Sequence, residues 1–177
     1  MNIRFGTSGW RAIIAEDFTF ANVERVTNAI CSYLKGSDEL TGRPLIIGHD
    51  TRFMGENFQA VSAEIGRQKG FRVLKCTHPV PTPTVSHAIR SNSAAGAINF
   101  TASHNPPEYQ GIKFSTSDGA PALPDVTKQI EKATEANEEP ADAPNGSITD
   151  HDPRAAYIED LETKVNFEAI AKSKAKY

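Results

Sequence analysis

The sequence predicts a three-layer α/β/α fold, in which a small, mostly parallel, mixed sheet of about four strands lies between helices. Short apolar runs alternate with helical repeats between residues 44 and 100, and the links between them are short. Strand–helix–strand order with short links favours right-handed crossovers and therefore parallel strands. At 177 residues the chain is long enough for one domain with a core of its own.

The spacing of apolar residues separates the strands from the helices. The predicted strands cover residues 44–48, 71–76 and 94–100, and the predicted helices cover residues 20–34, 56–69, 82–91 and 123–133. Thr19 is a suitable N-cap for the first helix, and Gly36 is a suitable residue to end it. Residues 111–114 are predicted to form a further strand at an edge of the sheet, reached by a hairpin-like return.

The composition changes near the C-terminus. Residues 137–147 are acidic and contain proline, which is typical of an exposed loop. Asp152 and Pro153 form a suitable start for a terminal helix at about residues 153–165. We therefore expect residues 1–177 to form a single domain with this loop and helix at its end.

The overall composition excludes several classes of protein. The net charge of −3 gives no broad basic surface, so we expect no nucleic-acid partner. The apolar runs are too short to cross a membrane, and no signal-peptide core follows Met1, so we expect a cytoplasmic protein. Cys31 and Cys76 lack the Cys-x-x-Cys spacing of redox and metal sites, which predicts two buried thiols.

Polar segments follow three of the predicted strands, at residues 49–52, 77–81 and 101–106. In open α/β sheets the carboxyl ends of parallel strands meet at one edge, where ligands bind. We interpret His49 and His78 as residues that stabilise loops. Arg52 could equally form a simple salt bridge with Asp50 or Glu56.

The third of these segments contains the candidate nucleophile. Ser103 lies at the tip of a proline-braced loop, with His104 beside it and Lys113 ten positions later. A small hydroxyl in a rigid polar loop is a candidate nucleophile or phosphoryl carrier, although an ordinary turn serine is the alternative. Near the N-terminus, residues 5–11 place two glycines before Arg11, a pattern that can bind an anion or form a plain turn.

Three motifs together resemble the α-D-phosphohexomutases, the phosphoglucomutase and phosphomannomutase enzymes. They are Thr-Ala-Ser-His-Asn-Pro at residues 101–106, Gly-Ile-Lys at 111–113 and Phe-Gly-Thr-Ser-Gly-Trp-Arg at 5–11. Asp-Thr-Arg at residues 50–52 also matches the family. Enzymes of this family have four domains, and this sequence is similar to the first one only. Gln110 stands where the family more often has asparagine.

The resemblance implies the role of each site residue. Ser103 carries a phosphoryl group that passes to a sugar phosphate, and a hexose 1,6-bisphosphate is both intermediate and activator. Lys113 acts as general acid and base, and His104 orients the substrate and shares proton transfer. The remaining implied contacts to phosphate or substrate come from Thr7, Arg11, Arg52 and Asn105. The phosphate on Ser103 also ligates Mg²⁺, whose other ligands lie outside this chain.

The resemblance also implies what this chain lacks. The family's metal loop, sugar-recognition loop and C-terminal phosphate loop are absent, so we expect the isolated chain to be inactive as a mutase. Its expected partners are a phosphosugar substrate and the later domains of the same polypeptide. The alternative is a stand-alone phosphosugar-binding or regulatory module that performs no catalysis.

Overall fold

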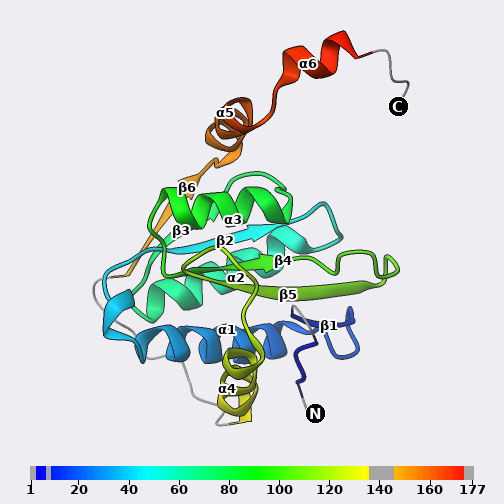
Figure 1. The fold of residues 1–177 in the computed structure, drawn as a ribbon. Coiled ribbons are helices and arrows are strands. Elements are labelled where there is room, and N and C mark those ends of the chain that lie inside the picture. Colours follow the sequence, from blue (N-terminus) through cyan, green and yellow to red (C-terminus); the bar gives the residue numbers. More distant parts are fainter. Residues whose placement is uncertain (1–2, 7–8, 136–145, 174–177) are drawn as a thin grey trace.

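A computed structural model describes residues 3–6, 9–135 and 146–173 of the chain. Its strands are β1 (Trp10–Ile13), β2 (Leu45–His49), β3 (Arg72–Cys76), β4 (Gly96–Phe100), β5 (Tyr109–Thr116) and β6 (Ser147–His151). Its helices are α1 (Phe20–Lys35), α2 (Gly55–Gln68), α3 (Thr82–Ser91), α4 (Pro124–Glu135), α5 (Arg154–Lys164) and α6 (Phe167–Lys172), with a short 3₁₀ turn at Asp38–Leu40. The predicted α/β class is confirmed (Figure 1).

The strands form one mixed sheet of six strands in the order β1-β5-β4-β2-β3-β6. The four strands from β4 to β6 in that order are parallel, whereas β5 runs antiparallel to both β4 and β1. The sheet therefore has two more strands than the four expected. The placement of residues 111–114 at an edge was wrong, because β1 covers that side of β5 and pairs Trp10 with Ile112.

The two strands that the sequence did not predict, β1 and β6, lack the apolar runs of the central strands. β1 follows directly on a glycine-rich segment and has only four residues. β6 is an edge strand whose residues are largely exposed, so its sequence contains no apolar run. Most of the predicted exposed loop at residues 137–147 lies outside the described residues, and its last residue, Ser147, begins β6.

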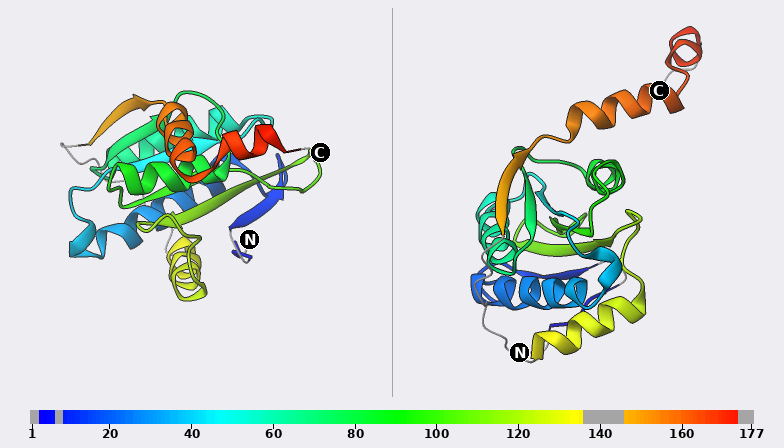
Figure 2. Two further views of the ribbon diagram at one scale, coloured as in Figure 1. Left: turned by 45° about the horizontal axis from the view of Figure 1, so that its top comes forward. Right: turned by 90° about the vertical axis from the view of Figure 1, so that its left-hand side faces the viewer.

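Helices cover both faces of the sheet (Figures 1 and 2). Helices α1 and α2 lie on one face, with α4 outside α1, and α3 lies on the other. Ile47, Ile98 and Phe100 face α1 and α2, while Ile46 and Ala97 pack in the cluster beneath α3. Because both faces of β2 and β4 are buried, these strands are continuous apolar runs.

The ends of α1 agree with the expected start and stop signals. The Thr19 hydroxyl accepts a hydrogen bond from the Asn22 amide at 3.3 Å, and Gly36 caps the helix C-terminus. The predicted apolar stripe is buried except at Phe20, which is 40% exposed. The Phe20 ring instead lies against the Phe58 ring, and the two ring centres are 4.7 Å apart.

The last helices extend away from the sheet (Figure 2). Helix α5 lies over α3, where the Tyr157 ring is 5.8 Å from the His87 ring and Asp160 is 3.7 Å from His87 Nε2. The terminal helix expected at residues 153–165 corresponds to α5, and α6 follows it. In the described part of the chain, no helix combines the length and apolarity that crossing a membrane needs.

Both cysteines are free and buried, as predicted. Burial raises the pKa of each thiol to about 12, so neither side chain is a ready nucleophile.

Candidate active site

The carboxyl ends of β2 and β4 lie side by side and carry the two segments that form the candidate site. His49 pairs with Phe100 at the last step of the parallel ladder, and the Asp50 amide then donates to the Phe100 carbonyl at 2.9 Å. Residues 50–54 and the β4–β5 loop, residues 101–108, therefore leave the same edge of the sheet (Figure 1). This arrangement brings Arg52 and Ser103 together.

The third expected segment, residues 77–81, divides between two places. Its Val80 amide donates to the His49 carbonyl at 2.8 Å. His78, in contrast, lies near Arg154 of α5, with Nδ1 3.1 Å from the guanidinium, and so belongs to the β6 side of the molecule. His49 is buried and its Nδ1 lies 2.7 Å from the Asp50 carbonyl, which agrees with a loop-stabilising histidine.

The loop after β4 turns tightly and exposes Ser103. The Thr101 hydroxyl accepts from the Ser103 amide at 3.0 Å, and the Asn105 amide donates to the carbonyl of the fully buried Ala102 at 3.1 Å. Ser103 has a φ of 56°, in the left-handed region. A non-glycine residue in this conformation costs about 1–2 kcal/mol, so its surroundings must impose the conformation.

The His104 imidazole pairs with the serine hydroxyl. Ser103 Oγ lies 3.3 Å from His104 Nδ1, and both side chains are exposed. Asn105 follows in the same turn and is half-buried. The three residues therefore present polar groups at one loop tip.

Arg52 lies against this loop and donates to its backbone. Its Nη1 donates to the carbonyls of Pro106 and Tyr109 at 2.9 and 3.0 Å. Its Nη2 donates to the carbonyls of Ser103 and Asn105 at 3.0 and 2.5 Å. The terminal nitrogens of Arg52 thus lie on four carbonyls of the serine loop, and the phosphate contact implied by the resemblance stays a prediction.

Gln110 links β5 to the segment that follows β2. Its side chain is fully buried, donates from Nε2 to the Phe53 carbonyl at 3.2 Å and accepts from the Gly111 amide at 3.1 Å. The glutamine therefore ties the segment that carries Arg52 to β5. Sequence reasoning noted Gln110 only as a departure from the family pattern, and nothing in one sequence indicates this bridge.

Lys113 and Arg11 lie on the same face of the sheet. Arg11 pairs with Gly111 and Lys113 pairs with Asn99, and alternate residues of β5 point to the same side. A Cβ atom at position 111 would come within 2.9 Å of Arg11 Cγ and 2.6 Å of the Thr101 carbonyl oxygen. The arginine side chain therefore passes over Gly111 towards the start of the serine loop.

Lys113 is half-buried and its pKa is lowered. Burial is the larger cause, because it disfavours the charged ammonium, and the positive charge of Arg11 is the second. A lowered pKa increases the fraction of neutral amine, the form that accepts a proton. The direction of this shift is the one that a lysine general base requires, and the catalytic role of Lys113 stays a prediction.

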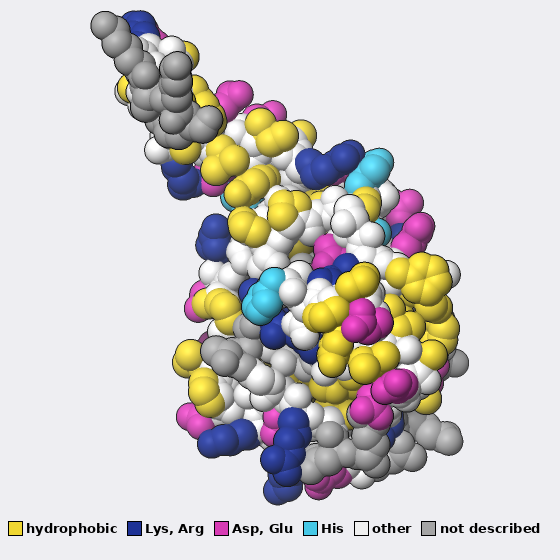
Figure 3. Space-filling model, turned by 90° about the vertical axis from the view of Figure 1, so that its right-hand side faces the viewer, with side chains coloured by type: hydrophobic (Ala, Val, Ile, Leu, Met, Phe, Trp, Pro, Cys, Tyr) yellow, Lys and Arg dark blue, Asp and Glu magenta, His cyan; other side chains and the backbone are white. Residues whose placement is uncertain are grey.

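The glycine-rich segment near the N-terminus packs beside Lys113. A Cβ atom at Gly9 would lie 2.3 Å from the Ile112 carbonyl oxygen and 3.1 Å from Lys113 Cα. The segment therefore reaches the candidate site, as its sequence suggested, although Thr7 itself lies outside the described residues. Figure 3 shows lysine and arginine side chains gathered next to a histidine on the face at this end of the molecule.

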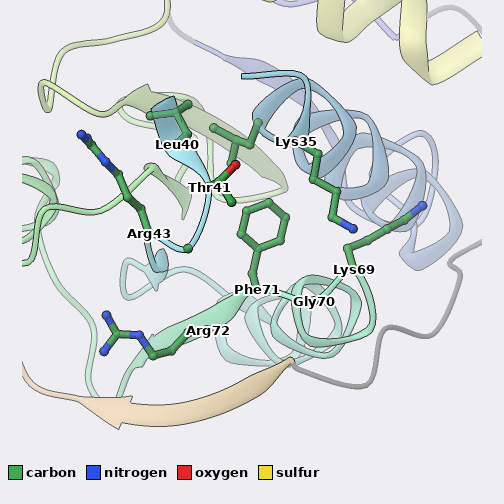
Figure 4. Close-up of a pocket in the computed structure, with 10 residues that line it drawn as sticks. Lys35, Leu40, Thr41, Arg43, Lys69, Gly70, Phe71 and Arg72 are labelled. Carbon is green, nitrogen blue, oxygen red and sulfur yellow. The ribbon is translucent and has the colours of Figure 1, made fainter. Parts of the chain in front are cut away.

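A hollow of about 440 Å³ lies at the opposite end of the parallel strands, where β2 and β3 begin. It is lined by four cationic side chains, Lys35, Arg43, Lys69 and Arg72. Figure 4 shows the Phe71 ring between the two lysines and the two arginines. Helices α1 and α2 both end here, and lysines at helix C-termini offset the partial negative charge of the last carbonyls. The helix ends account for the two lysines, so the Ser103 loop remains the candidate active site.

The chain matches the family described as phosphoglucomutase/phosphomannomutase, alpha/beta/alpha domain I, over residues 2–141. The chain belongs to this family. It is 33% identical to the phosphoglucomutase of Komagataeibacter xylinus over 97% of the chain and 34% of the relative. It is 38% identical to a "probable phosphoglucosamine mutase" of Methanosphaera stadtmanae over 72% of the chain and 27% of the relative.

Solved structures of the phosphoglucomutase/phosphomannomutase family have the same fold. A crystal structure described as a "putative phosphomannomutase" from Thermus Thermophilus matches with a TM-score of 0.84 and 38% identity, over 96% of this chain and 37% of that one. The chain therefore spans about a third of the length of the relatives it matches. The relatives named above are mutases of different phosphosugars.

Proposed function

We propose that this chain is the phosphoserine-bearing domain of a hexose-phosphate mutase, which interconverts a sugar 1-phosphate and a sugar 6-phosphate. The observation that carries the proposal is the presentation of Ser103. Its exposed hydroxyl lies 3.3 Å from His104, in a loop whose carbonyls are held by Arg52. Family membership and the mutase names of the relatives support the same reaction class.

The reaction consists of two phosphoryl transfers. In the first, a sugar hydroxyl attacks the phosphorus on Ser103, the bond to Ser103 Oγ breaks, and neutral Lys113 takes the hydroxyl proton, while the His104 imidazole gives a proton to the leaving serine oxygen. The product is a hexose bisphosphate. After the bisphosphate has reversed its orientation in the site, Ser103 Oγ attacks the other phosphate and His104 takes the hydroxyl proton. The sugar–phosphate bond breaks, and Lys113 returns its proton to the sugar oxygen. Atoms and charge balance over the two steps.

The other residues position the charged groups. His104 lies beside the serine oxygen and would orient the substrate hydroxyl. Arg11 lies on the same sheet face as Lys113, where it would bind phosphate, and its charge adds to burial in lowering the pKa of the lysine. Asn105 and Thr7 complete the proposed phosphate contacts. Transfer between rigidly held groups depends mainly on positioning and on neutralising charge.

Magnesium is the cofactor that family membership implies. Among the described residues, no three or more His, Cys, Asp or Glu side chains gather as a metal site. The Asp50 carboxylate, close to the serine loop, accepts from the Arg52 amide. The described residues thus do not form a magnesium site, and a phosphate on Ser103 would be one ligand. We propose that the other ligands come from later domains of the same polypeptide.

The test uses the natural polypeptide that carries this sequence. Ser103→Ala should reduce mutase turnover on the order of a thousandfold or more, because no acceptor for the phosphoryl group remains. Ser91→Ala in α3 serves as the matched control and should keep full turnover. If Ser103→Ala binds phosphosugar normally and the wild type shows no turnover, the chain is a phosphosugar-binding module. Full turnover by Ser103→Ala would contradict the proposal.

A further inference from the structure

We propose that Arg52 is a positioning residue that imposes the conformation of the Ser103 loop, and that it does not bind substrate phosphate. The inference rests on the proposed function, in which Ser103 carries the phosphoryl group. It differs from the role expected for Arg52 from the sequence. The argument depends on where the hydrogen-bond donors of its guanidinium point.

A guanidinium has five N–H bonds, of which four are on the two terminal nitrogens. In Arg52 each terminal nitrogen donates to two carbonyls, which are those of Ser103, Asn105, Pro106 and Tyr109. The fifth N–H, on Nε, faces Asp50 Oδ2 at 3.7 Å. The terminal nitrogens of Arg52, which would form a bidentate contact with a phosphate, are therefore already hydrogen-bonded to loop carbonyls, and Nε forms a longer ion pair with Asp50.

The position of Arg52 is itself fixed by its neighbours. Its amide donates to Asp50 Oδ1 at 2.8 Å, which closes a local turn after β2. The next residue, Phe53, has its carbonyl held by Gln110 of β5 at 3.2 Å. The side chains of Arg52 and Asp50 are 16% and 24% exposed, so water competes weakly for these contacts. Arg52 is therefore a rigid base for the loop.

The contacts explain the unusual backbone of the serine. The Ser103 carbonyl and the Asn105 carbonyl lie on the same nitrogen of a planar group, which restricts how the peptides between them can rotate. This restriction holds Ser103 at its positive φ and fixes the direction of its hydroxyl. Because transfer is sensitive to misplacement of about 1 Å, loss of the restraint is expected to slow phosphoryl transfer about 100-fold.

A lysine at this position keeps the charge but provides no planar fork. Arg52→Lys should therefore keep the positive charge and lose the hydrogen bonds to the four carbonyls, whereas Arg52→Met removes both. Arg72→Lys at the far edge of the sheet is the matched control, because Arg72 is exposed at the start of β3. In the natural polypeptide, we would measure amide hydrogen exchange of residues 101–111 together with kcat and KM for glucose 1-phosphate.

The expected result is at least about fivefold faster exchange at the Asn105 and Tyr109 amides in Arg52→Met, since a loop hydrogen bond contributes about 1 kcal/mol, which corresponds to about fivefold. Exchange in β2 and β4 should stay unchanged, kcat should fall, and KM should stay within about twofold. Arg52→Lys should show the same pattern with smaller changes, and it supplies the test if Arg52→Met does not fold. Arg72→Lys should match the wild type.

A phosphate-binding role would give the opposite pattern, a raised KM with unchanged loop exchange, and would overturn the proposal. Unchanged exchange with unchanged kinetics would also overturn it. Failure of the proposed mutase function gives a different result. In that case the wild type shows no turnover, while the exchange measurement still reports whether Arg52 orders the loop.

Discussion

At the residue scale, Lys113 and Ser103 have properties set by their immediate neighbours. Lys113 has a lowered pKa because it is half-buried on a strand and lies near the charge of Arg11. Ser103 has a positive φ, and its carbonyl and amide are held by Arg52 and Thr101. Both properties agree with the proposed chemistry, in which a neutral amine takes a proton and a fixed hydroxyl carries a phosphoryl group.

The lowered pKa of Lys113 predicts a particular dependence of stability on pH. At pH values between the lowered folded pKa and the ordinary value of 10.5, the unfolded chain binds more protons than the folded chain. The titration of Lys113 should therefore contribute a rise in the free energy of unfolding across that window, against the fall that the two buried thiols contribute because their pKa values are raised to about 12. Lys113→Met should flatten this rise, as measured by urea unfolding at a series of alkaline pH values.

The control for this prediction is Lys128→Met, at an exposed position on α4. It should leave the slope of stability against pH unchanged over the same window. A slope in Lys113→Met equal to that of the wild type would show that Lys113 titrates alike in the folded and unfolded chain.

At the element scale, β5 is the strand on which the site is built. It carries Lys113, pairs with β4 at one side and with β1 at the other, and holds the Arg52 segment through Gln110. Gly111 is the point where the Arg11 side chain and the Thr101 carbonyl approach the strand. The short β1 therefore has a specific role, because it places Arg11 next to Lys113.

Gly111→Ala tests the close approach at this strand. The new Cβ atom would lie 2.6 Å from the Thr101 carbonyl oxygen and 2.9 Å from both the Trp10 carbonyl oxygen and Arg11 Cγ. Overpacking against backbone should lower the free energy of unfolding by about 1–3 kcal/mol. Gly6→Ala is the control, because its nearest neighbour would be 3.7 Å away, and it should change stability by less than about 0.5 kcal/mol. Equal stability of the two variants in urea unfolding would contradict this packing.

At the scale of the whole molecule, the central strands are covered on both faces, whereas β6 and α5 lie at the periphery. Cys31 is buried in α1 within the larger core cluster, and Cys76 lies in β3 opposite His151 of β6. Regions with exposed strands and few buried contacts open at lower free energy than the core. The two cysteines therefore report on different parts of the molecule.

We expect iodoacetamide to label Cys76 faster than Cys31 in the native protein, because detachment of β6 exposes Cys76 while Cys31 requires unfolding of the core. The variants Cys31→Ala and Cys76→Ala each leave one thiol for measurement by intact mass. In increasing urea, the labelling rate of Cys31 should follow global unfolding. Faster labelling of Cys31 than of Cys76 would contradict this division of the molecule.

The sequence predicted most of the central sheet because those strands are buried on both faces and form apolar runs. It did not predict β6, which is exposed, or β1, which continues from a glycine-rich turn. Motifs indicated Ser103 and Lys113, since their chemistry is in their side chains. The contacts of Arg52 could not be predicted, because its acceptors are backbone carbonyls that have no sequence signal.

The most direct test of the proposed function is phosphoryl transfer to Ser103 itself. The natural polypeptide that carries this sequence should be incubated with glucose 1,6-bisphosphate and Mg²⁺, digested, and mapped by mass spectrometry. We predict one phosphate, located on Ser103 and absent from Ser103→Ala, that passes to the sugar when the free bisphosphate is removed and glucose 1-phosphate is added. Phosphate on another residue, or turnover of glucose 1-phosphate with Ser103 never phosphorylated, would contradict the account.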